Sequence, residues 1–256
     1  TFKFSSNINL MIFSDASLKG LRETQEDAHI IYKKKNTYLM GVFDGHGGSI
    51  VSRFLKNYVP KVLMQFVFPV DRTTITKVYD SLQNKLIEKH KRASITQGST
   101  AVSVIVDKKN ITCINVGDSR AILCRNDKVI TLSNDHKPNY PKERKRIERL
   151  GGQKYIKKMP GDDWRIKNLS VSRAFGDLDV VPYVTHRPEV RIIERNKKDK
   201  FIIIGCDGLW DVMTNLQAIN FVLKHADQKK KVASLLAKEA IKKGTEDNVT
   251  VIVGWF

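Results

Sequence analysis

An apolar run that ends in a carboxylate, an imidazole and three glycines constrains this chain more than any other feature. The run is Tyr38 to Phe43, and Asp44-Gly45-His46-Gly47-Gly48 follows it directly. Such a run is typical of a buried strand, and the glycines indicate unusual backbone angles or a close approach of another backbone. Taken alone, the Asp-Gly pair is equally typical of an ordinary hairpin turn. A side chain at the end of a rigid strand is nevertheless held more firmly than one on a loop.

Two later strand-like runs border aspartates in the same way. Asp207 follows the apolar run 201–204, and Asp247 precedes the closing run 249–253. Each of these sites could be a simple turn. Their repeated position beside runs rich in β-branched or aromatic residues favours a shared role instead.

A hairpin is expected to bring two further acidic residues to the same place. Glu26 and Asp27 precede the run 29–32, which a short basic turn joins to the run that ends at Asp44. Antiparallel pairing places the start of one strand beside the end of its neighbour. Asp118 lies in another turn between two strand-like runs. We expect these carboxylates to converge at one rim of packed sheets.

The remaining patterns predict an antiparallel α+β fold. Helical spacing of apolar residues predicts helices at residues 51–62, 75–86, 216–223 and 232–241. Pro141 at its start and Gly151-Gly152 past its end predict a further, charged helix at residues 141–150. Pro60 is expected to kink the first helix, and Thr74 is expected to cap the second. Period-two alternation predicts a four-stranded β-meander at residues 101–106, 111–116, 121–125 and 128–132. Because no linker, repeat or low-complexity tract interrupts the pattern, we expect residues 1–256 to form a single domain.

The charge of the chain suggests an anionic partner without identifying one. Lys and Arg number 45 against 27 Asp and Glu, a net charge of +18. Nucleic acid, acidic proteins and membrane surfaces all attract such a chain. The basic residues are spread along the sequence without an aromatic-interleaved stripe, which favours a solvated surface over a dedicated nucleic-acid or membrane site. The basic face of the helix 141–150 is interpreted in the same way, with docking of an acidic substrate as the alternative.

The location and redox state follow from weaker signals. No window holds about 18 uncharged apolar residues, and the start of the chain lacks the layout of a secretory signal. The cysteines, Cys113, Cys124 and Cys206, show no CxxC or zinc spacing, so we expect buried free thiols in a reducing compartment. We therefore expect a cytoplasmic or nuclear protein, and a monomer.

Clustered carboxylates need a compensating charge. They repel one another, and burial penalises their charged form, so they would shift toward protonation or move apart. A bound divalent cation removes this conflict. An all-oxygen ligand set without Cys or a suitable His pair favours Mg²⁺ or Mn²⁺ over Zn²⁺. The sequence therefore predicts a magnesium or manganese site.

Such a site predicts hydrolysis of a phosphate ester. Two metals about 3.5–4 Å apart can lower the pKa of a shared water and aim it at phosphorus for in-line attack. Arg22 offers a planar fork suited to a phosphate dianion, and His46 lies where it could donate a proton to the departing alkoxide. Neither GxSxG nor the P-loop signature is present, which disfavours a serine nucleophile and a P-loop nucleotide enzyme.

Short motifs occur along nearly the whole chain. They are Gly20-Leu21-Arg22, Glu26-Asp27-Ala28, Val42 to Gly48, Gly98-Ser99-Thr100-Ala101, Gly117-Asp118-Ser119-Arg120, Asp135-His136-Lys137-Pro138, Ser172 to Asp177, Cys206 to Asp211, and Glu246 to Thr250. In these segments the chain resembles the metal-dependent serine/threonine protein phosphatases of type 2C. The order and spacing of the segments agree together, which makes the combined signal far more specific than any single motif.

The resemblance implies a fold, a cofactor and a substrate class. The fold would be a four-layer αββα sandwich, two antiparallel β-sheets flanked by helix pairs. The cofactors would be two Mg²⁺ or Mn²⁺ ions with a weaker third, and the substrates would be phosphoserine and phosphothreonine proteins.

The resemblance also implies individual roles. Asp44 would bridge the two metals, the Gly45 carbonyl would bind one, and Asp207 and Asp247 would bind the other. Glu26, Asp27 and Thr100 would hold the metals' water ligands, and Asp118 and Asp211 would form the third site. Arg22 would hold phosphate, and His46 would be the general acid. The family carries a flap after the Ser-Arg-Ala-Phe-Gly-Asp motif; here that segment, residues 178–188, is short, so the resemblance does not predict substrate preference.

Two alternatives belong to other classes of function. A pseudophosphatase scaffold would bind acidic or phosphorylated partners without turnover, but it would require the loss of a metal ligand, and none is lost. A nucleic-acid-associated phosphatase or nuclease is suggested by the charge alone.

Overall fold

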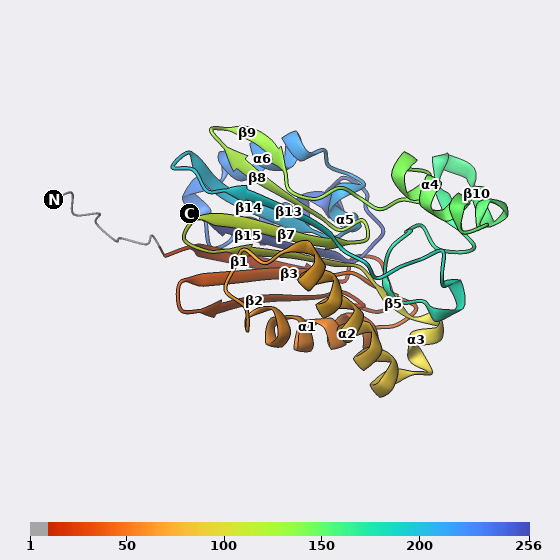
Figure 1. Ribbon diagram of the computed structural model, residues 1–256. Coiled ribbons are helices and arrows are strands. Elements are labelled where there is room, and N and C mark those ends of the chain that lie inside the picture. Colours follow the sequence, from red (N-terminus) through yellow and green to blue (C-terminus); the bar gives the residue numbers. More distant parts are fainter. Residues whose placement is uncertain (1–9) are drawn as a thin grey trace.

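Two five-stranded antiparallel sheets pack face to face at the centre of the molecule (Figure 1). The computed structural model describes residues 10–256, apart from the side chain of Asp162. The first sheet contains, in spatial order, β1 (Ile12–Leu18), β15 (Val249–Trp255), β14 (Asp199–Gly205), β8 (Arg120–Arg125) and β9 (Lys128–Thr131). The second contains β13 (Glu189–Glu194), β7 (Asn110–Val116), β6 (Ala101–Val106), β3 (Thr37–Phe43) and β2 (Ala28–Lys34).

The outer face of each sheet, the face turned away from the other sheet, is covered by a pair of helices. On the second sheet lie α1 (Ile50–Leu63) and α2 (Arg72–His90), while α6 (Asn215–Lys224) and α7 (Val232–Lys242) lie on the first. The predicted four-layer αββα sandwich is confirmed. Pro60 lies inside α1.

Alternation along the strands explains why both faces of each sheet are buried. In β3, Met40 and Val42 belong to the apolar cluster between the sheets, whereas Leu39 and Phe43 pack beneath α1 and α2. Successive strand residues point to opposite faces, so a strand covered on both sides is apolar throughout. This explains the uninterrupted apolar run that precedes Asp44.

The hairpin prediction is confirmed, and two local predictions are wrong. Strands β2 and β3 pair with Ala28 opposite Phe43, so Asp27 and Asp44 adjoin the same end of the hairpin. The expected four-stranded meander is two hairpins instead, because the chain leaves the second sheet after β7 and enters the first at β8. The N-cap of α2 is Asp71, whose carboxylate accepts the Thr74 N–H at 3.0 Å, so Thr74 is not the cap.

Smaller elements gather at the end of the sandwich that lies away from the start of β1 and from the C-terminus (Figure 1). A three-stranded sheet joins β12 (Phe175–Gly176), β5 (Gly98–Ser99) and β4 (Gly45–His46). A hairpin of β10 (Ile156–Lys158) and β11 (Trp164–Ile166) packs near α4 (Pro141–Arg149) over a fourth apolar cluster that contains Ile147 and Val171. Short helices complete the fold: α3 (Ala93–Thr96), α5 (Asp207–Trp210), and 3₁₀ turns at Gln153–Tyr155, Pro160–Asp162, Leu178–Val180 and Ala226–Gln228.

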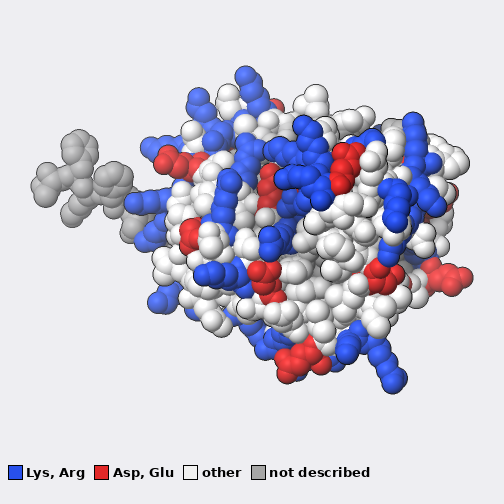
Figure 2. Space-filling view, turned by 45° about the vertical axis from the view of Figure 1, so that its right-hand side comes forward, with Lys and Arg blue, Asp and Glu red and all other residues white. Residues whose placement is uncertain are grey.

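The displayed face carries charges of both signs, and the three cysteines are buried. Figure 2 shows Lys and Arg side chains distributed over the displayed face, with Asp and Glu side chains between them. Cys113, Cys124 and Cys206 are free and buried, as expected. Within residues 10–256, no helix combines the length and the apolar character needed to cross a bilayer.

Candidate metal centre

A cavity of about 480 Å³ opens where the two sheets end. Its lining joins the β1–β2 loop, the turn after β3, the start of β6, the β7–β8 crossing, α5, and the loop before β15. Among the residues proposed from the sequence, the lining contains Arg22, Glu26, Asp44, Gly45, His46, Thr100, Asp118, Asp207 and Asp247. The structure therefore brings together side chains that lie more than 200 residues apart in the chain.

Three carboxylates form a close group in this cavity. One oxygen each of Asp44, Asp118 and Asp207 lies within 4.8 Å of the others. A second group shares Asp44 and adds Asp27 and the Cys206 sulfur within the same limit. Asp247 lines the cavity but belongs to neither group.

The electrostatics of the cluster oppose its charged form. Burial and then the charges of Asp207 and Asp27 raise the pKa of Asp44 well above its usual range. Burial and then the charges of Asp118 and Asp211 do the same to the pKa of Asp207. This is the conflict that the sequence predicts for clustered carboxylates, and it identifies a site suited to a cation.

Asp27 does not line the cavity, but its buried carboxyl lies beside Asp44 and also favours a cation site. Burial raises the pKa of its carboxyl to about 6, although a hydrogen bond from Thr250 lowers it in part. Its Oδ2 is buried and has no hydrogen-bond partner among the described residues. A buried carboxylate oxygen without a donor is an expected ligand, direct or through water, for a hard cation.

Cys206 lies inside the cluster without the properties of a metal ligand. Its sulfur accepts the Thr250 N–H at 3.1 Å and donates to the Asn248 carbonyl at 3.3 Å. Burial, and then the neighbouring carboxylates, raise the pKa of this thiol well above its usual range. Because the thiolate is the form that binds metal, the usable donors are oxygens, which fit Mg²⁺ or Mn²⁺.

Backbone hydrogen bonds fix Asp44 at the end of its strand. The Thr100 hydroxyl accepts the Asp44 N–H at 3.2 Å, and the Asp44 carbonyl accepts the Thr100 N–H at 2.9 Å. The next residue must be glycine because a Cβ there would overlap the Glu26 carbonyl and crowd the Ser52 hydroxyl. The glycine of the motif thus allows the β1–β2 loop to pack directly against the metal-site turn.

His46 is held by a residue to which the sequence assigned no role. Its Nε2 lies 2.9 Å from both carboxylate oxygens of Asp177. Burial lowers the pKa of His46, but Asp177 more than offsets this and raises it above its ordinary value. A Cβ at Gly98 would overlap both partners, so this glycine makes room for the pair. Asp177 is the last residue of the Ser-Arg-Ala-Phe-Gly-Asp motif, which was the available signal.

Arg22 and Glu26 lie on the wall formed by the β1–β2 loop. Arg22 Nη2 donates to Asp247 Oδ2 at 2.8 Å, and the arginine side chain is 60% exposed. Such an exposed pair is worth little energy, so a phosphate could replace the aspartate as the partner of the guanidinium. The Glu26 carboxylate accepts the Gly48 N–H at 3.0 Å and the Thr24 hydroxyl at 3.1 Å.

The two residues expected at a third metal site differ in position. Asp118 belongs to the tight carboxylate group and also contacts the Lys137 amine. Burial lowers the pKa of that amine, but the charges of Asp118 and Asp207 outweigh burial and raise it. Asp211 lies outside the cavity lining, although burial raises its pKa and its charge acts on Asp207.

The segment expected as a flap is not the one that borders the cavity. None of residues 178–188 lines it, whereas Arg165, Asn168, Leu169, Ser170 and Val171 do. Arg165 belongs to β11, and the other four residues follow that strand. All five precede the Ser172–Asp177 motif, whereas the expected flap follows it. Their sequence has no periodicity or motif that predicts a position at the cavity.

Comparisons with known proteins identify the family. The family model described as "Protein phosphatase 2C" matches residues 12–249. The chain is 35% identical over 245 residues to the probable protein phosphatase 2C 52 of Oryza sativa subsp. japonica, covering 93% of this chain and 49% of that protein. It is also 35% identical to the probable protein phosphatase 2C 59 of the same species, covering 98% and 77%. The chain thus spans about half the length of the first of these relatives.

Solved structures agree with this result. The crystal structure of a phosphatase from a pathogenic strain of Toxoplasma gondii superimposes with a TM-score of 0.85 at 25% identity. That match covers 96% of this chain and 92% of the other.

Proposed function

This chain belongs to the protein phosphatase 2C family, and from this premise we propose that it removes phosphate from phosphoserine and phosphothreonine residues of proteins with the help of Mg²⁺ or Mn²⁺. The observation that carries the proposal is the group of Asp44, Asp118 and Asp207, with one oxygen of each within 4.8 Å of the others in an open cavity. Carboxylates that raise one another's pKa in this way are suited to divalent cations.

The carboxylates of the cavity would hold the metal. Asp44, with the Gly45 carbonyl, Asp207 and Asp247 would be the direct ligands, and Asp118 would complete a weaker site with Asp211. Glu26, Asp27 and Thr100 would hold water beside them. When bound, two divalent cations supply a Lewis acid and a water of lowered pKa at neutral pH.

Two further side chains would act on the substrate. Arg22, exposed at the cavity wall, would bind two phosphate oxygens with its planar guanidinium. His46 would protonate the departing serine or threonine oxygen. Because Asp177 occupies Nε2, the transferred proton would come from Nδ1. No covalent intermediate with the protein is required.

A phosphothreonine peptide tests this function. We expect phosphate release that depends on Mn²⁺, and we expect Asp44→Asn and Asp207→Asn to lower kcat/KM at limiting Mn²⁺ by at least about 100-fold, since each removes a charge from the metal site. Circular dichroism should show that both variants remain folded, because each substitution relieves repulsion between buried carboxylates. Lys238→Gln, at an exposed position of α7, serves as the control and should retain activity.

The same assay contains the results that would defeat the proposal. A wild-type protein that binds Mn²⁺ but releases no phosphate would behave as a pseudophosphatase. Near-full turnover of either aspartate variant at limiting Mn²⁺ would show that the ligand assignment is wrong.

A further inference from the structure

Three consecutive residues, Asp135, His136 and Lys137, all contact residues 117–120, the turn between β7 and β8 with the first residue of β8. Asp135 accepts hydrogen bonds from Arg120 Nε at 2.9 Å and from Arg120 Nη2 at 2.6 Å. Lys137 donates to the carboxylate of Asp118. His136 bonds to Gly117. The proposed reaction assigns no role to this motif. The turn that the motif contacts nevertheless supplies Asp118 to the proposed metal centre.

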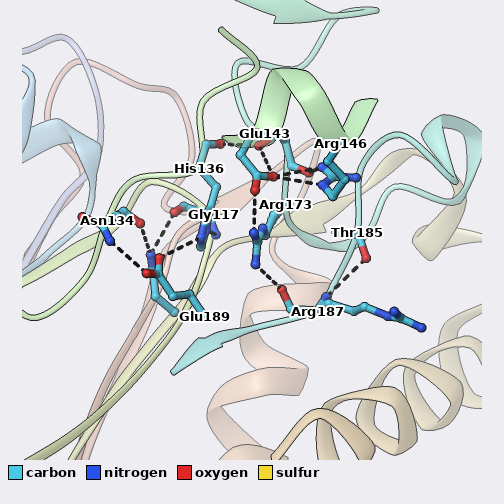
Figure 3. Close-up of polar contacts among 11 residues, drawn as sticks. Gly117, Asn134, His136, Glu143, Arg146, Arg173, Thr185, Arg187 and Glu189 are labelled. Carbon is cyan, nitrogen blue, oxygen red and sulfur yellow. Dashed lines mark hydrogen bonds and ion pairs between the residues drawn. The ribbon is translucent and has the colours of Figure 1, made fainter. Parts of the chain in front are cut away.

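His136 holds the backbone of this turn on both sides. Its N–H donates to the Gly117 carbonyl at 3.1 Å, and its Nδ1 accepts the Gly117 N–H at 3.1 Å (Figure 3). Since Nδ1 accepts this bond, a neutral ring carries its proton on Nε2. That nitrogen lies 3.4 Å from Oε2 of Glu189, and the His136 residue is 2% exposed. Burial and the two bonds to Gly117 therefore hold the ring in position, while Nε2 has no hydrogen-bond partner among the described residues.

A second buried layer holds His136 itself. Its carbonyl accepts the Ser172 N–H at 2.8 Å, and the Ser172 hydroxyl lies 2.9 Å from the Glu143 carboxylate. Glu143 binds Arg173 Nη2 at 2.5 Å and Arg146 Nη2 at 3.0 Å, as Figure 3 shows. This network ties the motif to α4 and to the segment that leads to Asp177.

The turn needs such support for two reasons. It is the point at which the chain crosses from one sheet to the other, so the ladder of neither sheet covers it, and Gly117 adopts a φ of +103° there. It also presents the buried Asp118 carboxylate to Asp44 and Asp207, which repel it. Without external contacts the repulsion would move Asp118 away from the cluster.

We propose that His136 is a positioning residue that holds the Gly117–Asp118 turn and thereby keeps Asp118 available to the divalent cation that it binds. This inference rests on the proposed function, because that function makes Asp118 a metal ligand. Asp135 and Lys137 complete the clamp by holding Arg120 and the Asp118 side chain.

Two substitutions of His136 test whether a hydrogen-bond acceptor is needed at the position of Nδ1. In His136→Asn the amide oxygen can occupy the place of Nδ1 and accept the Gly117 N–H, whereas in His136→Gln the amide lies at the place of Nε2 and leaves that N–H without an acceptor. The probe is Mn²⁺ alone, and the free-Mn²⁺ electron paramagnetic resonance signal measures binding. His225→Gln, at the end of α6, is the histidine control.

We expect His136→Gln to weaken the weakest Mn²⁺ binding step about tenfold or more, and His136→Asn to stay within about threefold of the wild type. The control should match the wild type, and thermal unfolding should show all variants folded. Equal Mn²⁺ binding by His136→Gln and the wild type would overturn the clamp. Equal loss in both His136 variants would also overturn it, since the acceptor would then be irrelevant.

Mn²⁺ binding tests the positioning role of His136 independently of the proposed phosphatase activity, because binding requires no turnover. A wild type that binds Mn²⁺ without releasing phosphate defeats the function and leaves the clamp standing; a wild type that binds no Mn²⁺ defeats both. If His136→Gln does not fold, ¹⁵N magnetic resonance of the wild type decides. The clamp requires an unprotonated Nδ1 on His136 and a slowly exchanging Gly117 amide, and a protonated Nδ1 or a rapidly exchanging amide overturns it.

Discussion

At the scale of single residues, the contact between His46 and Asp177 determines how the proposed general acid could work. Asp177 contacts the imidazole at Nε2, which in the proposed reaction would leave Nδ1 as the proton donor. Gly98 matters to this contact although it carries no side chain, because a Cβ there would overlap both partners. The chemistry of one residue thus depends on a glycine about 50 positions away and on an aspartate beyond it.

His46→Gln should separate leaving groups by their need for a proton. We expect this variant to slow hydrolysis of alkyl phosphates by roughly 100-fold, because an alkoxide departs poorly unless it is protonated. Aryl phosphates, whose leaving groups are stable as anions, should slow much less. Steady-state rates for one substrate of each kind provide the measurement. Equal slowing of both would show that His46 does not act as the acid.

At the scale of elements, a buried carboxylate ties α4 to the segment that precedes β12. Glu143 is 3% exposed and binds Arg146, Arg173 and Ser172. Burial alone would raise the pKa of Glu143, but the hydrogen bond and charge of Arg173, and then Arg146, outweigh it and lower the pKa to about 2. The ionised form is therefore the one that stabilises the fold.

The stability of the protein should fall in acid through this group. With a pKa of 4.5 in the unfolded chain and about 2 when folded, Glu143 contributes about 3 kcal/mol that is complete above pH 4.5 and lost as the pH falls toward 2. Glu143→Gln should be less stable at pH 7 and should lose less stability than the wild type between pH 4.5 and 3. Urea unfolding at each pH measures this. Parallel curves for the two proteins would contradict the account.

Several elements could be predicted from the sequence because their cause is local. The β2–β3 hairpin follows from two apolar runs and a short turn, and α4 follows from Pro141 at its start. The meander prediction was wrong because period two specifies a strand but not its sheet, and nothing local marks the crossing at Gly117. Thr74 and Asp71 are both good caps, and only the structure decides between them.

At the scale of the whole molecule, the sequence suggested that acidic strand ends would meet but could not show how. Asp44, Asp207 and Asp247 line one cavity because the two sheets end together, which depends on packing across the chain. Asp211 was expected beside them, yet it lies outside the lining. The cavity segment Arg165–Val171 was not found, because its position depends on how the β10–β11 hairpin packs.

Removal of metal should make stability depend on pH in a specific direction. The folded pKa of Asp27 is raised to about 6, and burial and neighbouring carboxylates also raise the pKa values of Asp44 and Asp207 well above their usual range. Such groups favour the folded state below their unfolded pKa, and this contribution is lost as the pH rises through the folded value. In EDTA, stability should therefore decline from pH 5 to pH 7.

Added Mn²⁺ should reverse that decline. Binding at 100 times the dissociation constant stabilises a protein by about 2.7 kcal/mol, and the ligands bind only when deprotonated. We expect the difference in melting temperature between Mn²⁺ and EDTA to grow between pH 5 and pH 7. Asp44→Asn is the matched control and should show a much smaller difference. A difference that is constant with pH would argue against carboxylate ligands.

The central claim is that divalent cations hold together acidic residues from distant parts of the chain. A crystal grown with Mn²⁺ and measured at the manganese absorption edge tests it most directly. We expect two anomalous peaks in the cavity. Both should lie within coordination distance of Asp44, and one of them should also lie within coordination distance of Asp207. A well-ordered cavity without an anomalous peak at saturating Mn²⁺, or peaks that avoid Asp44, would contradict it.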